Sequence, residues 1–223
     1  MNKKVVLITI LAAAALAIGA GIYYFLPENQ PQGQYGIDLS HHNKVTNWDK
    51  VTASFVILKA TEGATYQDPT FKNYRNEAQK REIPVGAYHL LSPTSKMKDQ
   101  FHNFATVVGN NIDILPVIDV ECTTSIANLG KAKLQKMVRE FADSCKARYG
   151  CSPIIYTCTG FYNKYFSVGF SDCLFWSGDV NAKRQINCAI HQKEIRSVPG
   201  VAGKVDYDVL HCKLSDILLI YKR

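Results

Sequence analysis

Two acidic residues separated by one position, Asp119 and Glu121, give the sharpest chemical signal in the chain. They follow the apolar run Ile114–Ile118, which predicts a buried strand. Strand residues two positions apart point to the same side, so both carboxyl groups would face one cavity. Like charges in a confined site raise the pKa of one group and leave a protonated acid beside an ionised one. Hydrolysis of a glycosidic bond requires that combination.

Three further acids stand at the ends of predicted strands. Asp38 closes the first strand, Glu62 follows the second, and Asp206 opens the last. For an isolated D-x-E pair, loop capping or pairing with a Lys or Arg is the better explanation. Acids at several strand ends favour an active site instead, because the C-terminal strand ends of a β/α barrel meet at one face. We therefore expect an acidic active site at that face.

Two other chemistries remain open at these positions. Clustered carboxylates with His41, His42 or His89 could hold a divalent cation. Adjacent strand residues point to opposite faces, which disfavours His41 and His42 as a facing pair. A cysteine nucleophile would need a histidine base, and the acids beside Cys122 would raise the pKa of its thiol. We therefore assign no metal ligands and no catalytic cysteine.

Three aromatic residues, Tyr88, Tyr156 and Trp176, lie at or near predicted strand ends. The C–H faces of sugar rings stack on aromatic side chains, so these residues are candidates for substrate contact. Core packing is the ordinary explanation for any one of them. Because Ser177 and Gly178 follow Trp176, we expect this side chain to be the most exposed of the three.

From Tyr35 onward, apolar strands alternate with segments of helical periodicity. The last third of the chain keeps the strands and loses the helices. The expected strands are 35–39, 55–60, 85–91, 114–120, 154–157, 174–177, 189–192 and 205–210, and the expected helical segments are 47–52, 69–81, 94–108, 129–149 and 161–166.

This order of elements predicts an α/β fold. We expect an irregular TIM-like barrel with five β/α units followed by three further strands, which are candidates for antiparallel pairing. An open doubly wound sheet is the alternative. A doubly wound sheet with a nucleotide site would have a Gly-rich phosphate-binding loop after a strand, and the sequence contains no such loop.

The N-terminus has the composition of a membrane-targeting segment. Lys3 and Lys4 precede the uncharged run Val5–Leu26, and ~20 apolar residues suffice to cross a bilayer. We expect residues 1–26 to be a signal anchor or a cleaved signal peptide, followed by a linker at 27–34 and a domain at 35–223. The lysines before the apolar run place the domain outside the cytoplasmic membrane, in the cell envelope.

The formal net charge is +7, which favours anionic partners such as a membrane surface or an acidic wall polymer. The chain has no long Lys/Arg run, so we expect no nucleic-acid partner. Its seven cysteines are an odd number, so at least one stays unpaired or pairs between chains. Cys145 and Cys151 could bridge across a helix end, and most of the others are expected to be small buried residues.

A series of short motifs resembles those of glycoside hydrolase family 25, the N-acetylmuramidases or lysozymes with a β/α barrel. The motifs extend over roughly Tyr35 to Leu210, and their number and order make the likeness specific. They are Gly36-Ile-Asp-Leu-Ser-His-His42, Lys59-Ala-Thr-Glu-Gly63 with Tyr66 and Asp68, Gly86-Ala-Tyr-His89, Leu115-Pro-Val-Ile-Asp-Val-Glu121, Ile155-Tyr-Thr157, Phe175-Trp176, Gln192 and Val205-Asp206-Tyr-Asp208.

This resemblance implies hydrolysis of the β-1,4 bond between N-acetylmuramic acid and N-acetylglucosamine in peptidoglycan. It implies Glu121 as the general acid and Asp119 as the carboxylate that steadies the substrate acetamido group or the oxocarbenium charge. Asp38 and Asp206 match two further acids that shape the site. We expect no cofactor, a monomer, and peptidoglycan glycan strands as the partner. The expected substrate-binding residues are Tyr88, Tyr156, Trp176, Gln192 and Glu62.

The chain departs from the family pattern at a few positions. The family usually has tryptophan at the position of His191 and asparagine at that of Asp208, and a different pattern follows Trp176. We expect these changes at the binding rim, where they would affect substrate preference and the level of activity. They motivate a second hypothesis, a wall-glycan-binding protein with weak or no catalysis on the same scaffold.

Overall fold

The structure is a computed structural model that describes residues 34–180 and 188–219. The predicted leader at 1–26 and the linker up to Gly33 lie outside the described residues. Among the residues that are described, none of the helices has both the length and the apolar character needed to cross a membrane.

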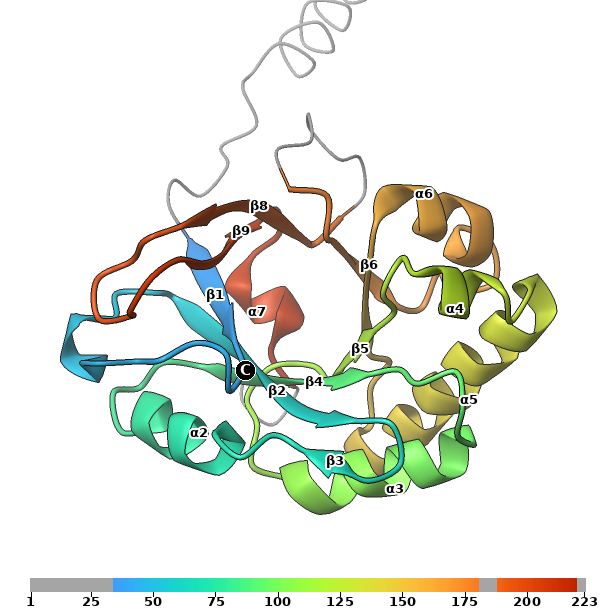
Figure 1. Cartoon of the computed structure of the whole chain (residues 1–223), viewed down its shortest axis with the longest axis horizontal. Helices are drawn as coiled ribbons and strands as arrows, with labels where there is room; N and C mark the ends of the chain where they lie inside the picture. The colour runs from blue at the N-terminus through green and yellow to red at the C-terminus, as the bar shows by residue number, and fades with distance from the viewer. Residues whose placement is uncertain (1–33, 181–187, 220–223) are drawn as a thin grey trace, which may run out of the picture. The chain divides into compact units, whose positions relative to one another are not determined.

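Eight strands in this part of the chain close into a barrel (Figure 1), which confirms the predicted TIM-like architecture. Neighbouring strands are parallel from β1 through to β8, whereas β9 is antiparallel to both β8 and β1. A short strand, β3 (Tyr66–Gln67), forms a hairpin on the end of β2. The barrel strands are β1 (Tyr35–Leu39), β2 (Phe55–Glu62), β4 (Val85–Leu90), β5 (Val117–Asp119), β6 (Ile154–Thr157), β7 (Leu174–Ser177), β8 (Ile190–Arg196) and β9 (Val205–Leu210).

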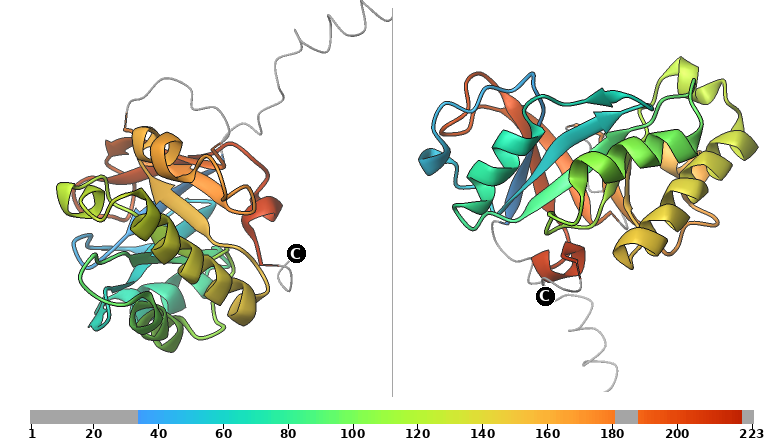
Figure 2. Two further views of the ribbon diagram at one scale, coloured as in Figure 1. Left: turned by 90° about the vertical axis from the view of Figure 1, so that its right-hand side faces the viewer. Right: turned by 90° about the horizontal axis from the view of Figure 1, so that it is seen from below.

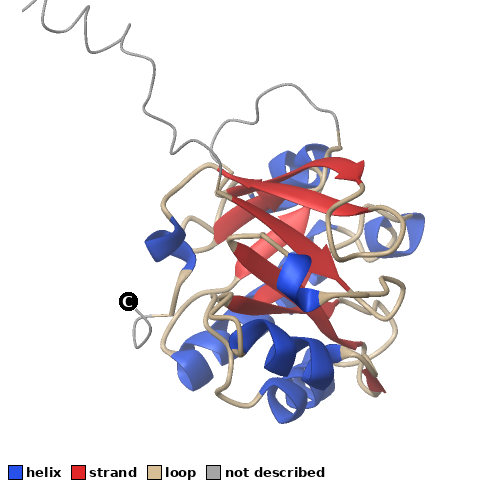
Figure 3. Cartoon of the chain, turned by 90° about the vertical axis from the view of Figure 1, so that its left-hand side faces the viewer, coloured by secondary structure: helices blue, strands red, loops and turns tan. Residues whose placement is uncertain are grey.

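Helical segments follow each of the first five barrel strands and lie on the outside of the strands (Figures 2 and 3). Within the described residues, the last three strands have no such helix between them. The helical segments are η1 (Trp48–Lys50), α2 (Phe71–Gln79), α3 (Met97–Val108), α4 (Thr124–Ala127), α5 (Lys131–Tyr149), α6 (Thr159–Phe161), η2 (Tyr162–Phe166) and α7 (Leu214–Ile217).

The long helix α5 shows why these segments are helical and how they cover the sheet. Leu134, Val138 and Phe141 recur at helical spacing and are fully buried. The Phe141 ring packs 5.5 Å from that of Phe104 on α3, so the two helices share one apolar layer outside the barrel. The helix ends at Gly150, whose left-handed backbone (φ 72°) is a conformation that glycine adopts without steric cost.

The fourth barrel strand differs from its prediction of 114–120. Pro116 has no N–H to donate, and β5 begins only at Val117. The preceding residues pair instead with the C-terminal segment, because Ile114 bridges to Leu218 and the Leu115 N–H donates to the Ile217 carbonyl at 2.8 Å. This segment and its helix α7 have too few residues for a periodic signal, so no element was predicted there.

One disulfide joins Cys122 to Cys158. Cys122 follows Glu121 beyond the end of β5, and Cys158 directly follows β6, so the bond ties two neighbouring strand ends together. No bond joins Cys145 and Cys151, which were expected as a possible bridge. Cys145 instead faces the core from α5 and is fully buried, as expected for a small apolar residue.

We expect reduction of the Cys122–Cys158 bond to destabilise the barrel. The bond closes a loop of 36 residues, and the lost constraint on the unfolded chain amounts to about 3–4 kcal/mol. Treatment with a phosphine reductant should therefore lower the Tm by roughly 6–16 °C. The double variant Cys122→Ala, Cys158→Ala should start at the lower Tm and not respond to reductant. Equal Tm values for the oxidised and reduced parent would contradict this expectation.

Candidate active site

Eight of the nine predicted site residues line one cavity at the C-terminal ends of the parallel strands. The cavity has a volume of about 180 Å³ and is lined almost entirely by polar and aromatic side chains. Glu62 is the predicted residue that does not reach it. The lining residues are Asp38, Tyr88, Val117, Asp119, Glu121, Tyr156, Trp176, Gln192 and Asp206.

Strand register explains why residues so far apart in sequence meet here. Asp38 on β1 is directly opposite Asp206 on the antiparallel strand β9. On the other side of the barrel, Asp119, Tyr156 and Trp176 occupy one row across three neighbouring parallel strands. Each side chain therefore points into the barrel at a similar height.

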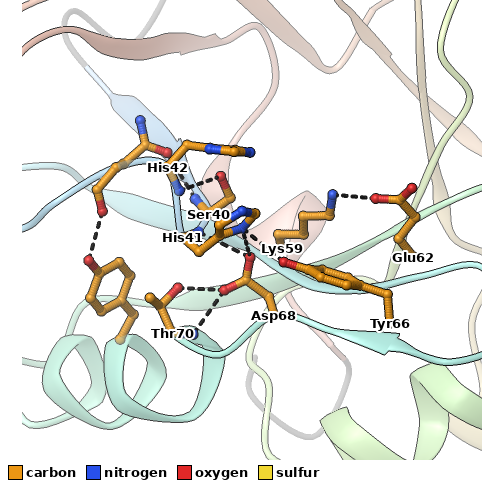
Figure 4. Close-up of polar contacts among 10 residues, drawn as sticks. Ser40, His41, His42, Lys59, Glu62, Tyr66, Asp68 and Thr70 are labelled. Atoms are coloured by element: carbon orange, nitrogen blue, oxygen red, sulfur yellow. Dashed lines mark hydrogen bonds and ion pairs between the residues drawn. The ribbon is translucent and has the colours of Figure 1, made fainter.

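Glu62 lies outside the cavity because it forms an ion pair with Lys59 (Figure 4). The Lys59 Nζ is 2.7 Å from Glu62 Oε2, and the lysine side chain is only 10% exposed while that of Glu62 is 45% exposed. Lys59 in turn acts on the cavity, because its charge favours the ionised form of Asp119. Glu62 thus contacts the cation that neighbours the site and not the cavity itself.

The acids differ in their exposure to water. Glu121 is exposed at the mouth, whereas Asp119 is 8% exposed. Burial raises the pKa of Asp119 well above its usual range, and the charges of Glu121 and Asp38 raise it further. Burial also raises the pKa of Asp38, with Asp206 adding to the effect. The expected pairing of like charges is therefore present, and it raises the pKa of Asp119.

Tyr156, Trp176 and Gln192 form one wall of the cavity. The Tyr156 hydroxyl donates to Gln192 Oε1 at 2.6 Å, and its ring meets that of Trp176 edge-on with centroids 4.9 Å apart. Gln192 also hydrogen-bonds Asp206, which opposes the rise that burial causes in the pKa of that carboxyl group. Trp176 was expected to be the most exposed aromatic, and this was wrong, because the residue is 2% exposed, with its ring against that of Tyr156 and its indole N–H close to Asp208.

Asp208 is a site residue whose role the sequence analysis did not foresee. The positions of Asp208 and His191 were expected at the rim, yet Asp208 is fully buried and His191 is 5% exposed. Asp208 lies two residues after Asp206 on β9, so both side chains point into the barrel. The spacing of two residues between Asp206 and Asp208 could have identified Asp208 from the sequence, because the same spacing identified Asp119 and Glu121.

His41 and His89, which were considered as metal ligands, form hydrogen bonds with neighbouring side chains. His41 Nδ1 lies 2.8 Å from Asp68 Oδ2 and 3.0 Å from the Tyr66 hydroxyl (Figure 4). His89 is buried between Thr61 and Gln100, and burial lowers its pKa to about 4. Within residues 34–180 and 188–219, no three His, Cys, Asp or Glu side chains form a group suited to holding a metal ion.

A β/α barrel with several carboxyl groups and an aromatic wall at its C-terminal mouth is the arrangement of a glycoside hydrolase. The profile of the Glycosyl hydrolases family 25 matches residues 37–195. The chain belongs to this family.

Named relatives are consistent with this assignment. The chain is 30% identical to the autolytic lysozyme of Clostridium acetobutylicum over 182 residues, covering 78% of this chain and 54% of the relative. It is 27% identical over 174 residues to an N,O-diacetylmuramidase of Arthroderma benhamiae, covering 70% of this chain and 73% of the relative. The chain thus spans about half the length of the clostridial lysozyme.

Among solved structures, the bacterial lysozyme from Streptomyces coelicolor superposes with a TM-score of 0.78 at 26% identity. The alignment covers 86% of this chain and 99% of the Streptomyces chain. The whole described domain, and not an isolated motif, therefore has the fold of that lysozyme.

We expect Gly178→Ala to disturb the aromatic wall. A Cβ at this position would lie 2.6 Å from the Tyr156 hydroxyl, so the ring must shift, and its hydrogen bond to Gln192 would be strained. The free energy of unfolding, measured by urea denaturation, should fall by about 1–3 kcal/mol. Gly160→Ala is the matched control, because nothing lies within 4 Å of a Cβ there. An equal effect of the two substitutions would show that Gly178 is not needed for clearance.

Proposed function

We propose that this protein is a muramidase that hydrolyses the β-1,4 bond between N-acetylmuramic acid and N-acetylglucosamine in bacterial peptidoglycan. The observation that carries the proposal is the meeting of Asp38, Asp119, Glu121 and Asp206 in one cavity of a family 25 barrel. The names of two relatives, a lysozyme and an N,O-diacetylmuramidase, support the same substrate.

Glu121 is the proposed proton donor. Its exposure at the mouth of the cavity allows it to reach the glycosidic oxygen of a long glycan strand and to exchange its proton with water. Protonation of the leaving oxygen lowers the barrier to cleavage of the bond from the anomeric carbon. The product that leaves first is the sugar that carries this oxygen.

Asp119 lies deeper than Glu121 in the same cavity. Its place beside Tyr156 at the base of the site suits contact with the substrate acetamido group or with the charge that develops on the sugar ring. Asp38 and Asp206 lie across from it on β1 and β9 and complete the acidic surround. The partly exposed rings of Tyr88 and Tyr156 give this polar site apolar surface on which a sugar ring can stack, and the buried Trp176 supports Tyr156 from behind.

A glycan-binding protein without turnover is the second candidate function. It is favoured by the carboxyl group of Asp208, which stands inside the cavity wall where the family usually has a neutral amide. Such a protein would bind soluble glycan strands and leave their length unchanged, so the experiment below also separates the two functions.

We further propose that the domain works in the cell envelope, outside the cytoplasmic membrane. The apolar run of residues 5–26 supports export or anchoring. The Cys122–Cys158 disulfide adds independent support, because such bonds persist in oxidising compartments and are rare in the cytosol. Peptidoglycan, the proposed substrate, lies in the same location.

We expect Glu121→Gln to abolish cleavage while leaving the fold intact. The amide keeps the size of the side chain but has no acidic proton, so turnover should fall by at least about 100-fold. The soluble domain from Gln34 is incubated with purified peptidoglycan, the products are reduced with borohydride, and the new reducing ends are identified by mass spectrometry. The parent should yield reduced muramic acid ends.

Glu140→Gln is the matched control, since Glu140 is an exposed acid on α5 outside the cavity. It should cleave at the parental rate. Full activity in Glu121→Gln would remove Glu121 from its proposed role. Binding of glycan by the parent without new reducing ends, on several wall types, would favour the second candidate function.

A further inference from the structure

Asp208 is a fully buried carboxyl group in the wall of the proposed active site. On β9 it is paired with Gly36 of β1 on one side and Gln192 of β8 on the other. Neither of its oxygens accepts a well-aligned hydrogen bond from the described residues. Because Asp38 is opposite Asp206, Asp208 is its diagonal neighbour on the same face of the β1–β9 pair, and the two carboxyl groups interact directly. No cation of residues 34–180 or 188–219 acts on this pair.

The strands around Asp208 place further negative charges beside it and few groups that stabilise its ionised form. Asp38 on β1 and Asp206 on β9 both act directly on Asp208, and both disfavour its ionised form. The indole of Trp176 on β7 is a neighbouring group that favours ionisation, and its N–H has no aligned partner among the described residues. From β8, the facing residue is the neutral Gln192.

The more distant charges do not change this balance. Asp119 at the end of β5 and Glu121 just beyond it bring two more acids to the same cavity. Among the residues that the structure describes, Lys59 on β2 is a cation near the site, and it is held by Glu62 at 2.7 Å and acts on Asp119. Among the described residues, a second negative charge beside Asp38 would thus have no counter-ion, and a buried carboxyl group in such surroundings stays neutral.

We propose that Asp208 carries a proton at neutral pH and donates its O–H to the carboxylate of Asp38, so that it serves as a positioning residue in place of an amide. The O–H gives Asp38 a hydrogen-bond donor that fixes its orientation in the cavity. The carbonyl oxygen of the same group then faces the Trp176 indole. An asparagine side chain would present the same pair of groups, an N–H donor and a carbonyl acceptor.

Protonation also gives the site a pH dependence of its own. In the unfolded chain Asp208 ionises at its ordinary pKa, whereas burial and Asp38 raise its pKa in the folded protein. Folding therefore binds a proton, and this group removes stability as pH rises from the unfolded pKa towards the folded one. Above the folded pKa, Asp38 loses its donor and faces a second negative charge.

The test compares Asp208→Asn with Asp208→Leu. Asparagine keeps the donor and cannot ionise, whereas leucine has similar size and no donor. Infrared difference spectra at pH 7 should show the C=O stretch of a protonated carboxyl group in the parent and its loss in Asp208→Asn. The Tm of Asp208→Asn should exceed that of the parent, by a margin that widens as pH rises.

The activity arm rests on the proposed muramidase function. The kcat of Asp208→Asn should stay within about twofold of the parental value at the pH optimum and decline less at alkaline pH. The kcat of Asp208→Leu should fall roughly tenfold or more, because Asp38 loses a hydrogen bond to its charged group. The KM should change less than kcat, since Asp208 is buried behind the residues that line the cavity.

Three results would overturn the proposal. These are a parental spectrum without the protonated carboxyl band, a Tm of Asp208→Asn that tracks the parental Tm at every pH, and a kcat of Asp208→Asn as low as that of Asp208→Leu. If the parent does not cleave peptidoglycan, the muramidase function fails, and the infrared and Tm arms still decide whether Asp208 holds the proton.

Discussion

The mutual repulsion of buried carboxyl groups is the constraint on which the rest of the site depends. Asp38, Asp119 and Asp206 line one small cavity with Glu121 at its mouth, and Asp208 is fully buried behind its wall. An ionised carboxylate in such a place destabilises the fold unless a proton, a donor or a cation offsets its charge. The residues around the acids supply these protons, hydrogen-bond donors and positive charges.

Each offset comes from a different part of the barrel. Lys59 supplies positive charge near Asp119, and Glu62 holds that lysine in place. Gln192 supplies a donor to Asp206, and the Tyr156 hydroxyl fixes Gln192 from the opposite side. The wall formed by Tyr156, Trp176 and Gln192 was expected to bind sugar, and it also keeps the acids in position. This second role explains why its aromatic side chains are more buried than stacking on a sugar would require.

The sequence predicts the barrel well because its signals are local. Apolar runs mark the strands, and acids at their ends mark the face on which a site forms, so eight of the nine expected site residues share one cavity. The errors have tertiary causes. Trp176 is buried by neighbours from other strands, and Glu62 is turned aside by Lys59. The short first part of the expected strand at 114–120 pairs with a C-terminal segment that has no periodic signal.

The pairing of β1 with β9 joins the first and last strands of the barrel, and this has a consequence for how the protein is made. A chain still emerging from a ribosome or a translocation channel has no β9, so the sheet remains open and Asp38 has neither Asp206 nor Asp208 opposite it. Contacts between such distant parts of a chain also form slowly. The cavity therefore cannot form until β9 has been made, because the two acidic faces of β1 and β9 come together only when residues 205–210 are present.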